Sequence, residues 1–417
     1  MYRKIIGALS FVMAILAFNA MIGLIKDGGA REEGLTNAVH YDGPLNALPM
    51  LWGALTVSAI VFVCLAIRFL PKPNRYLSML LGFSMLSAAW SEVPKSAIGG
   101  ALLLTAAYLL VVVHVRLSHP DDLIQAALRC LFAFEAMSIL FVVLVPHYGM
   151  AVGDHAGKWQ GIFTHKNGLG SFAAITFCLS YWDWLTRSRK FSALVALGAV
   201  ILVIGSQSTT AILIVVALAA FLSACHVASI RDAIYRCRVP VLLLVIVASA
   251  LIVYVSVTYD FGSTDEKYGT FSNRNLIWLY MLGKIALSPW FGYGLEQLSV
   301  INDADGADFA SSVGFLVASA HNGFLELLFA LGVIGVTLMG AMLVSFVRNL
   351  PRGKLFPLMM GYVCLFILEN TSESRLLGLN GDFLALLYLI ELSAKHKRAV
   401  VRSAARAIPV GPRGKIA

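Results

Sequence analysis

The sequence predicts an all-α polytopic membrane protein, because apolar residues are abundant, charged residues are scarce, and the apolar residues come in long blocks. Of the 417 residues, 59% are hydrophobic and 13% are charged, and the mean hydropathy is +0.80. A soluble domain carries about a quarter charged residues. A helix needs about 20 apolar residues to cross the hydrocarbon core of a bilayer. These observations exclude a soluble protein and predict about 12 transmembrane helices.

Twelve apolar blocks are the candidate spans. They lie at 5–25, 48–70, 76–90, 95–115, 123–146, 168–186, 191–205, 210–228, 239–258, 321–346, 355–372 and 376–394. The blocks that begin at Tyr76 and Phe191 are the weakest. No clear small-residue cleavage site follows the first block, so we expect it to remain as an anchor.

Lysine and arginine concentrate in alternate connections between the predicted spans. These basic connections hold Arg3/Lys4, Arg68/Lys72/Arg75, Arg116, Arg187/Arg189/Lys190, Arg231/Arg236/Arg238, Arg348/Arg352/Lys354 and the tail from Lys395. Cytoplasmic loops are enriched in basic residues, so both termini are expected to be cytoplasmic. The prediction is one transmembrane domain (1–394) with outward, periplasmic loops at 147–167 and 259–320, and a disordered basic cytoplasmic tail at 395–417. Topology and anionic lipid account for the net charge of +9 without nucleic acid.

No metal site and no disulfide framework is predicted. Five of the six cysteines fall inside predicted spans, and Cys237 lies beside a basic loop. The acidic residues Asp303, Asp305 and Asp308 in the larger outward loop are read as a solvated stretch.

The first polar segment is His165-Lys166-Asn167, at the outer end of a predicted span. Asn167 is expected to cap a helix that begins at Gly168. His165 and Lys166 would then lie beside the positive end of that helix, a place suited to an anion. An ordinary basic, glycine-bearing loop is the alternative interpretation.

Two further polar segments follow it. Ser206–Thr210, with Ser208 in the middle, is a short outward turn whose hydroxyls could simply cap the next span. Arg274 opens an apolar helix predicted at 274–287, which we expect to lie in the outer interface. Its planar guanidinium suits a phosphate group, and a bound anion would offset the unfavourable position of a cation at a helix beginning. A contact with lipid headgroups is the alternative role of Arg274.

The fourth segment, His321-Asn322-Gly323, opens a predicted span. Eleven residues make about three helical turns, so Gly332 is expected below His321 on the same helix face. A glycine there would let a lipid chain approach, with its polar head at His321. A capping histidine and a packing glycine are the alternative. Glu373 is expected to pair with Arg375 or Arg274.

These four segments, in this order, resemble the O-antigen ligase and Wzy-type polymerase superfamily from about Trp159 to Arg375. The most telling signals are His321 followed after ten residues by Gly332, and Arg274 followed by Ile277-Trp278 and by Pro289-x-x-Gly292-Tyr293-Gly294. The resemblance implies a glycosyltransferase C-type (GT-C) fold and a metal-independent enzyme without a cofactor. It also implies undecaprenyl-diphosphate-linked saccharides as substrates, at the periplasmic face of the bacterial inner membrane.

The resemblance also implies roles for individual residues. Arg274 would bind the diphosphate and His321 would serve the catalytic centre, either as the base for the acceptor hydroxyl or as a phosphate contact. The expected substrate-binding residues are His165, Lys166, Asn167, Ser208, Asn322, Gly332 and Glu373.

Within the superfamily, His165-Lys166-Asn167 and Ser208-Thr209-Thr210 resemble the exopolysaccharide polymerase branch. The ligases typically carry an arginine in the Ser206–Thr210 turn, and this chain has none there. A polymerase implies a flippase, a chain-length regulator and export proteins as partners. An O-antigen ligase that transfers the chain to lipid A-core is the alternative. A transporter or flippase is the alternative from another class, and its support is the intramembrane residue Glu135.

Overall fold

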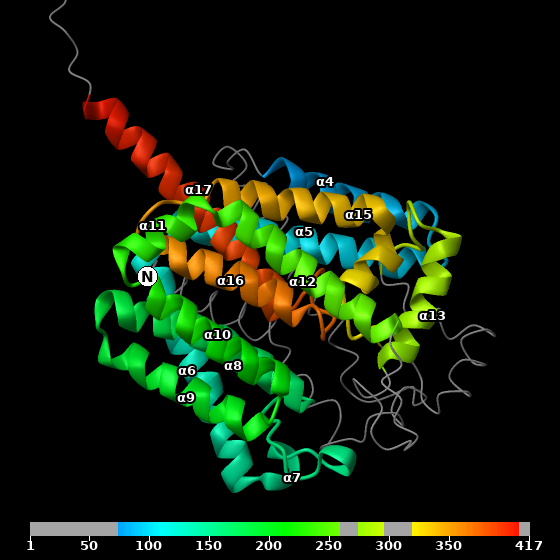
Figure 1. Cartoon of the computed structure of the whole chain (residues 1–417), viewed down its shortest axis with the longest axis horizontal. Helices are drawn as coiled ribbons and strands as arrows, with labels where there is room; N and C mark the ends of the chain where they lie inside the picture. The colour runs from blue at the N-terminus through cyan, green and yellow to red at the C-terminus, as the bar shows by residue number, and fades with distance from the viewer. Residues whose placement is uncertain (1–73, 259–273, 296–318, 408–417) are drawn as a thin grey trace, which may run out of the picture.

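The computed structural model describes residues 74–258, 274–295 and 319–407, and helices make up most of these ranges (Figure 1). Within them, β pairing is limited to one isolated bridge between Met150 and Trp159. The predicted spans at 5–25 and 48–70 lie outside the described residues, as does most of the loop at 259–320 with its acidic stretch.

The described helices are α4 (Arg75–Leu86), α5 (Pro94–Leu117), α6 (Pro120–Leu144), α7 (Pro146–Gly149), α8 (Lys166–Arg187), α9 (Lys190–Ser206), α10 (Thr209–Ala224), α11 (Ala228–Arg236), α12 (Arg238–Thr258), α13 (Arg274–Leu287), α15 (Gly323–Arg348), α16 (Leu355–Glu369) and α17 (Gly381–Ala407). Short 3-10 turns add Ser87–Ala89 and Gly153–His155. Each predicted span from Tyr76 onward therefore coincides with a helix.

Four of the described helices are long and apolar enough to cross a membrane alone: α5, α6, α12 and α15. A fifth is obtained if α10 and α11, which meet at a bend of 110°, count as one span. Helices α9 and α16 are apolar but shorter. The chain is thus mostly helical and compatible with an all-α membrane protein, while twelve spans and the GT-C fold stay predictions.

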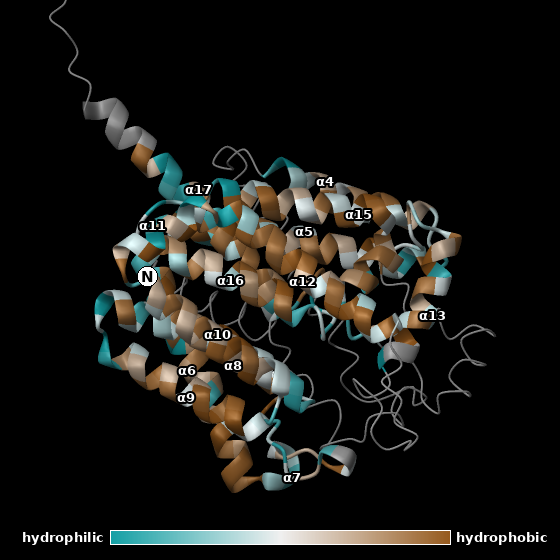
Figure 2. Cartoon of the chain, in the orientation of Figure 1, coloured by the Kyte–Doolittle hydropathy of each residue, from teal (hydrophilic) through white to brown (hydrophobic). Residues whose placement is uncertain are grey.

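The outer faces of several helices are apolar, as Figure 2 shows along α9, α10 and α12. Ile204, Leu213 and Leu244 expose between 65% and 68% of their surface. By contrast, α16 is almost entirely buried between its neighbours. Large contiguous apolar surfaces are rare on soluble monomers, and here they fit contact with lipid.

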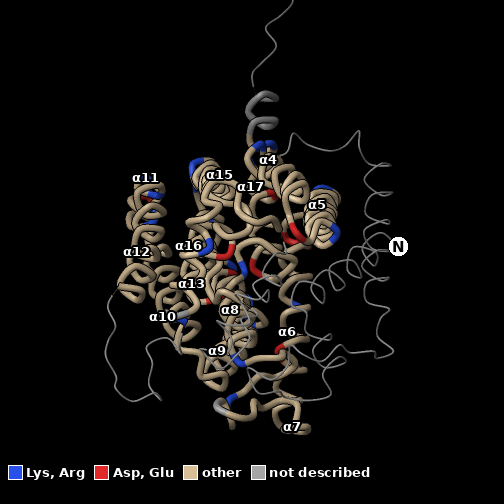
Figure 3. Tube along the Cα trace, turned by 90° about the vertical axis from the view of Figure 1, so that its right-hand side faces the viewer, with Lys and Arg blue, Asp and Glu red and all other residues tan. Residues whose placement is uncertain are grey.

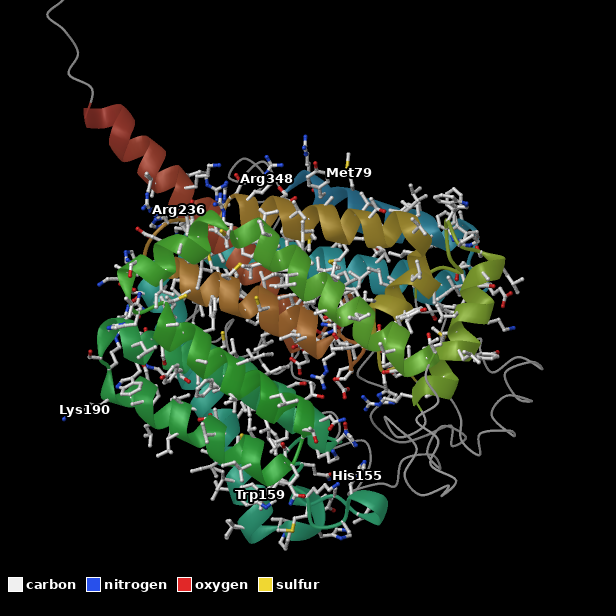
Figure 4. All side chains as sticks on the ribbon, viewed as in Figure 1. Met79, His155, Trp159, Lys190, Arg236 and Arg348 are labelled. Atoms are coloured by element: carbon white, nitrogen blue, oxygen red, sulfur yellow. The ribbon has the colours of Figure 1, made fainter. Side chains whose placement is uncertain are left out.

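Basic residues from three of the described connections lie at one end of the helix bundle. Lys190, Arg236 and Arg348 are labelled there in Figure 4, and His155 lies at the other end with the beginning of α8. Figure 1 shows α13 and the beginning of α15 at that other end as well. The alternation of charge along the sequence therefore corresponds to two distinct ends of the fold.

The prediction that the tail is disordered from residue 395 is wrong up to Ala407, because α17 continues through this segment. Its Lys395 ammonium donates to the backbone oxygens of Val115, Arg116 and Ser118. The last carbonyls of a helix have no partner within the helix, so Lys395 satisfies the end of α5 and extends the ordered part of α17.

The expected continuous helix through Gly332 is also wrong, because α15 is broken at this residue, with φ +61° and ψ −166°. The turn after α13 inserts its backbone at the break. Tyr293 N donates to Phe329 O at 2.9 Å, and Gly294 N donates to Ala330 O at 2.8 Å. A Cβ at Gly332 would overlap the backbone of Trp290. Gly332 therefore accommodates a protein turn, in place of the lipid groove predicted below His321.

Candidate active site

The candidate site is built around the polar loop that joins α16 to α17. Asn370 fixes the backbone of this loop: its Nδ2 donates to Phe366 O at 2.8 Å, and its Oδ1 accepts from Arg375 N at 2.8 Å. Asn370, Thr371 and Ser372 are all buried. The loop is therefore a rigid platform between two helices.

A buried ion pair closes the loop. The Arg375 guanidinium lies 3.4 Å from a carboxylate oxygen of Asp382, which is fully buried in the first turn of α17. Burial disfavours the charged form of Arg375, but the carboxylates of Asp382, Glu369 and Glu373 outweigh it and raise the pKa of the guanidinium. Arg375 therefore stays charged, and its partner is Asp382. Of the two partners predicted for Glu373, Arg375 and Arg274, the structure pairs it with Arg274.

The segment His321-Asn322-Gly323 docks onto this loop. Asn322 N donates to Ser374 Oγ at 3.1 Å, and Asn322 Nδ2 donates to Thr371 O at 3.0 Å. The same side chain caps α15 by accepting from the backbone of Phe324 and Leu325. Asn322, and not His321, is thus the residue that caps this helix.

Gly323 and His321 have complementary roles on either side of Asn322. Gly323 N donates to the carbonyls of Asn370 and Glu373, both at 2.9 Å, and a Cβ would overlap the Asn370 side chain. His321 adopts φ +47°, a left-handed conformation that is uncommon for residues other than glycine. The close docking of Asn322 and Gly323 holds this conformation and leaves the imidazole half-buried at the end of the helix.

Helix α13 brings Arg274 to the same loop. The Arg274 guanidinium donates to Ser372 O and lies 3.5 Å from Glu373 Oε1. One turn later, the fully buried Trp278 donates from Nε1 to Ala320 O at 2.8 Å. The helix therefore contacts both the loop after α16 and the backbone just before His321, which places Arg274 and His321 around one loop.

The predicted helix bounds of 274–287 are confirmed, but this helix also packs on the protein. It buries Ile277, Trp278, Met281 and Ile285 in a cluster with residues of α15, while Leu279 and Leu287 stay exposed. In this structure, the anion beside Arg274 at the helix beginning is Glu373 of the chain itself.

The beginning of α8 contributes the third part of the site. Asn167 Nδ2 donates to Glu373 Oε1 at 2.8 Å, and Lys166 Nζ donates to Asn167 Oδ1 at 3.2 Å. The cap of α8 is His165, whose Nδ1 accepts from Asn167 N at 3.2 Å. The prediction that Asn167 caps α8 is therefore wrong. Its side chain contacts Glu373, and the His165 imidazole caps the helix.

The Ser206–Thr210 turn touches the site through Thr210. Its hydroxyl lies 3.0 Å from the hydroxyl of Ser372. Ser208 is buried, and a Cβ at Gly170 would come within 2.8 Å of the Ser208 side chain. Ser208 thus packs the turn against α8, and Thr210 carries the polar contact with the loop.

The structure therefore brings Arg274, Asn167, Glu373 and Asn322 into one network, with Lys166, His165 and His321 at its edges. Gly332 and Ser208 lie outside this network and pack against other parts of the protein. Ser372, Asn370 and Asp382 were not singled out from the sequence. A run of seven polar residues, Glu369 to Arg375, between two apolar helices was the signal that could have found them.

The chemistry that this arrangement can perform is recognition of an anion. Arginine carries five N–H donors, and two of the Arg274 nitrogens contact Ser372 O and Glu373 Oε1. Lys166 contributes a second cation nearby, through Asn167. Over the described ranges, no three His, Cys, Asp or Glu side chains are grouped as metal ligands would be, and metal independence stays a prediction.

Glu135 lies apart from this network. It is 2% exposed on α6, and a Cβ at Gly198 of α9 would come within 2.9 Å of its carboxylate. Among the described residues, one of its oxygens, Oε1, has no hydrogen-bond partner.

Comparison with known families supports the assignment of these motifs. The family model described as O-antigen ligase matches residues 193–340, about a third of the chain. The matched segment includes Arg274, His321 and Gly332, whereas Asn167 and Glu373 lie outside it. No curated protein matches the chain. The match confirms that this chain resembles the O-antigen ligase and Wzy-type polymerase superfamily, over residues 193–340.

Proposed function

We propose that this protein is a polymerase of surface polysaccharide. It would transfer undecaprenyl-diphosphate-linked oligosaccharide repeats onto an acceptor saccharide at the periplasmic face of the inner membrane. The observation that carries the proposal is the meeting of Arg274, Asn167 and the His321 segment on the loop Asn370–Arg375. An enzyme of the O-antigen ligase type needs one site that neutralises a diphosphate and holds an acceptor hydroxyl.

In the proposed reaction, the acceptor oxygen attacks the anomeric carbon and the bond from that carbon to the diphosphate breaks. The lipid diphosphate leaves with both bonding electrons, so its negative charge grows. Arg274 and Lys166 would stabilise that charge. The acceptor proton would pass to His321, or to a phosphate oxygen if His321 instead holds the phosphate.

Glu373 gives the resting site a specific property. Its carboxylate lies beside Arg274 and accepts from Asn167, so an arriving diphosphate would compete with Glu373 for the guanidinium. The exchange of one anion for another would avoid leaving Arg274 as an unpaired cation in a partly buried place.

The preference for a polymerase over a ligase rests on the Ser206–Thr210 turn. Thr210 contacts Ser372, so the residues of this turn lie next to the loop that contacts Arg274. Ligases of the superfamily typically carry an arginine in this turn, and this chain has Thr209 and Thr210. Among the described residues, no comparable contact supports transport, because Glu135 of α6 packs against α9, outside the network.

The test begins with deletion of the gene and measurement of the size of lipid-linked and surface saccharides. Single repeats on the lipid carrier, without long chains, are expected of a lost polymerase. Long chains that remain on the carrier would instead identify a ligase. Complementation with Arg274→Ala or His321→Ala should not restore chain growth at normal protein abundance; if both variants polymerise, the assigned site is wrong.

A further inference from the structure

A polar cavity of about 690 Å³ lies at the basic end of the bundle. It is lined by Arg75 and Tyr76 of α4, Arg238 of α12, and Ala341, Val344, Ser345, Arg348 and Asn349 of α15. Helix α15 begins at the candidate active site and ends at this cavity, and its part after the break at Gly332, from Val333 to Arg348, alone spans about 24 Å. The volume falls within the range of about 300–1,000 Å³ found for small-molecule sites.

The cavity concentrates positive charge from three helices, whose basic positions are marked in Figure 3. In the part of the chain that the structure describes, no carboxylate forms an ion pair with Arg75, Arg238 or Arg348. A fourth cation approaches the rim, since Lys397 Nζ donates to Asn349 Oδ1 at 2.9 Å. This charge has no counterion among the described side chains.

The three arginines differ in how firmly they are held. Arg238 donates to the backbone oxygens of Val347, Tyr235 and Arg348, at 3.0, 2.7 and 2.9 Å. It therefore joins α12 to the end of α15 as a fixed cation. Arg75 is exposed, and within the described ranges its guanidinium forms a hydrogen bond only with the Tyr76 hydroxyl, at 2.6 Å.

Arg348 is the most available of the three. Its side chain is exposed, and its guanidinium makes no hydrogen bond to any residue in the described ranges. Arginine is suited to bidentate binding of phosphate oxygens. Arg75 and Arg348 can therefore turn toward a shared anion while Arg238 holds the two helices in place.

We propose that this cavity binds the phosphodiester headgroup of an anionic phospholipid. Ala341 and Val344 line the cavity toward the middle of α15, and Leu243, Leu244 and Val247 are exposed along α12. A phosphate at Arg348 would thus have apolar side chains beside it, along which acyl chains could lie. Basic pockets between membrane helices at a cytoplasmic surface are suited to such headgroups. The site is independent of the proposed polymerase activity.

The experiment is native mass spectrometry of the full-length protein in detergent, titrated with phosphatidylglycerol or with phosphatidylcholine. The wild-type protein should bind phosphatidylglycerol more tightly than phosphatidylcholine. Arg75→Gln and Arg348→Gln should each weaken its binding about fivefold, which corresponds to about 1 kcal/mol per basic residue near a membrane. Arg75→Lys together with Arg348→Lys keeps the charge and should keep most of the preference.

The matched control is Lys190→Gln, which removes one exposed positive charge at the same end of the bundle but away from the cavity (Figure 4). It should leave phosphatidylglycerol binding unchanged. An equal loss in this control would mean general attraction to a basic surface and would overturn the site. Equal retention of both lipids by the wild type would also overturn it. Displacement of phosphatidylglycerol by inorganic phosphate at the same concentration would assign the cavity to a soluble anion and refute the lipid proposal.

Discussion

Asn167 Nδ2 lies 2.8 Å from Glu373 Oε1, so the first turn of α8 is joined directly to the loop after α16. The two residues are 206 positions apart in the chain. Glu373 also lies 3.5 Å from Arg274. One carboxylate therefore links the three segments that we assign to substrate binding.

The first prediction concerns this link. Asn167→Asp would place two carboxylates within hydrogen-bond distance, with a repulsion on the order of 5 kcal/mol before relaxation and solvent screening. We expect chain growth to fall at least about tenfold, since 1.4 kcal/mol in a barrier is a factor of ten. The measurement is the length distribution of saccharides made from lipid-linked repeats by the purified variant.

The control for this prediction exchanges donor and acceptor. Asn167→Asp combined with Glu373→Gln keeps the total charge of the wild type and can re-form the hydrogen bond in the opposite direction. The double variant should therefore be more active than Asn167→Asp alone. If the losses of activity caused by the two substitutions simply add in the double variant, the contact between Asn167 and Glu373 has no part in catalysis.

The second prediction separates the backbone of His321 from its imidazole. Glycine adopts φ +47° without the strain that other residues incur. His321→Gly should thus leave the thermal unfolding temperature unchanged or slightly raised, while chain growth is lost. His321→Ala loses the imidazole as well, but retains a strain of about 1–2 kcal/mol. Chain growth by the glycine variant would exclude any chemical role for the side chain.

The third prediction tests the break in α15. Gly332→Ala places a Cβ into the backbone of Trp290 at φ +61°, so the left-handed conformation alone costs about 1–2 kcal/mol before the overlap is relieved. We expect a clear fall in the unfolding temperature of the purified protein. Gly340→Ala is the matched control in the same helix. No neighbouring atom lies within 4 Å of its new Cβ, so it should be neutral or stabilising by up to about 1 kcal/mol. Equal effects of the two substitutions would refute the tight fit at Gly332.

The fourth prediction concerns the contact between Lys395 of α17 and the end of α5, at the end of the bundle opposite the candidate site. Lys395→Ala would leave the carbonyls of Val115, Arg116 and Ser118 without their common donor. Each group left unsatisfied costs about 1–3 kcal/mol when buried, and less where water can replace the ammonium. Thermal unfolding should show a loss of stability that is larger than for Lys397→Ala, whose single contact with Asn349 is exposed. An unchanged unfolding temperature for Lys395→Ala would mean that water replaces the contact fully.

Much of the helical organisation could be read from the sequence, because hydropathy depends on residues that are close together along the chain. The predicted blocks from Tyr76 to 394 coincide with helices, and the bounds of α13 were predicted as observed. The predictions were wrong where contacts between distant parts of the chain overrode a preference of the local sequence. Asn167 did not cap α8 because Glu373 engages its side chain, and α15 did not continue through Gly332 because the turn at Trp290 satisfies the freed backbone groups.

The sequence by itself determined a helical, membrane-type chain, its basic and polar ends, and the identity of Arg274 and His321 as candidate residues. Apolar periodicity and charge alternation are local properties, so they can be read without a structure. Only the tertiary structure decided that Asn370–Arg375 is the loop on which α8, α13 and the His321 segment meet. It also decided that Glu373 pairs with Arg274 while Arg375 pairs with Asp382. These pairings depend on how distant helices pack, and composition cannot distinguish one buried carboxylate partner from another.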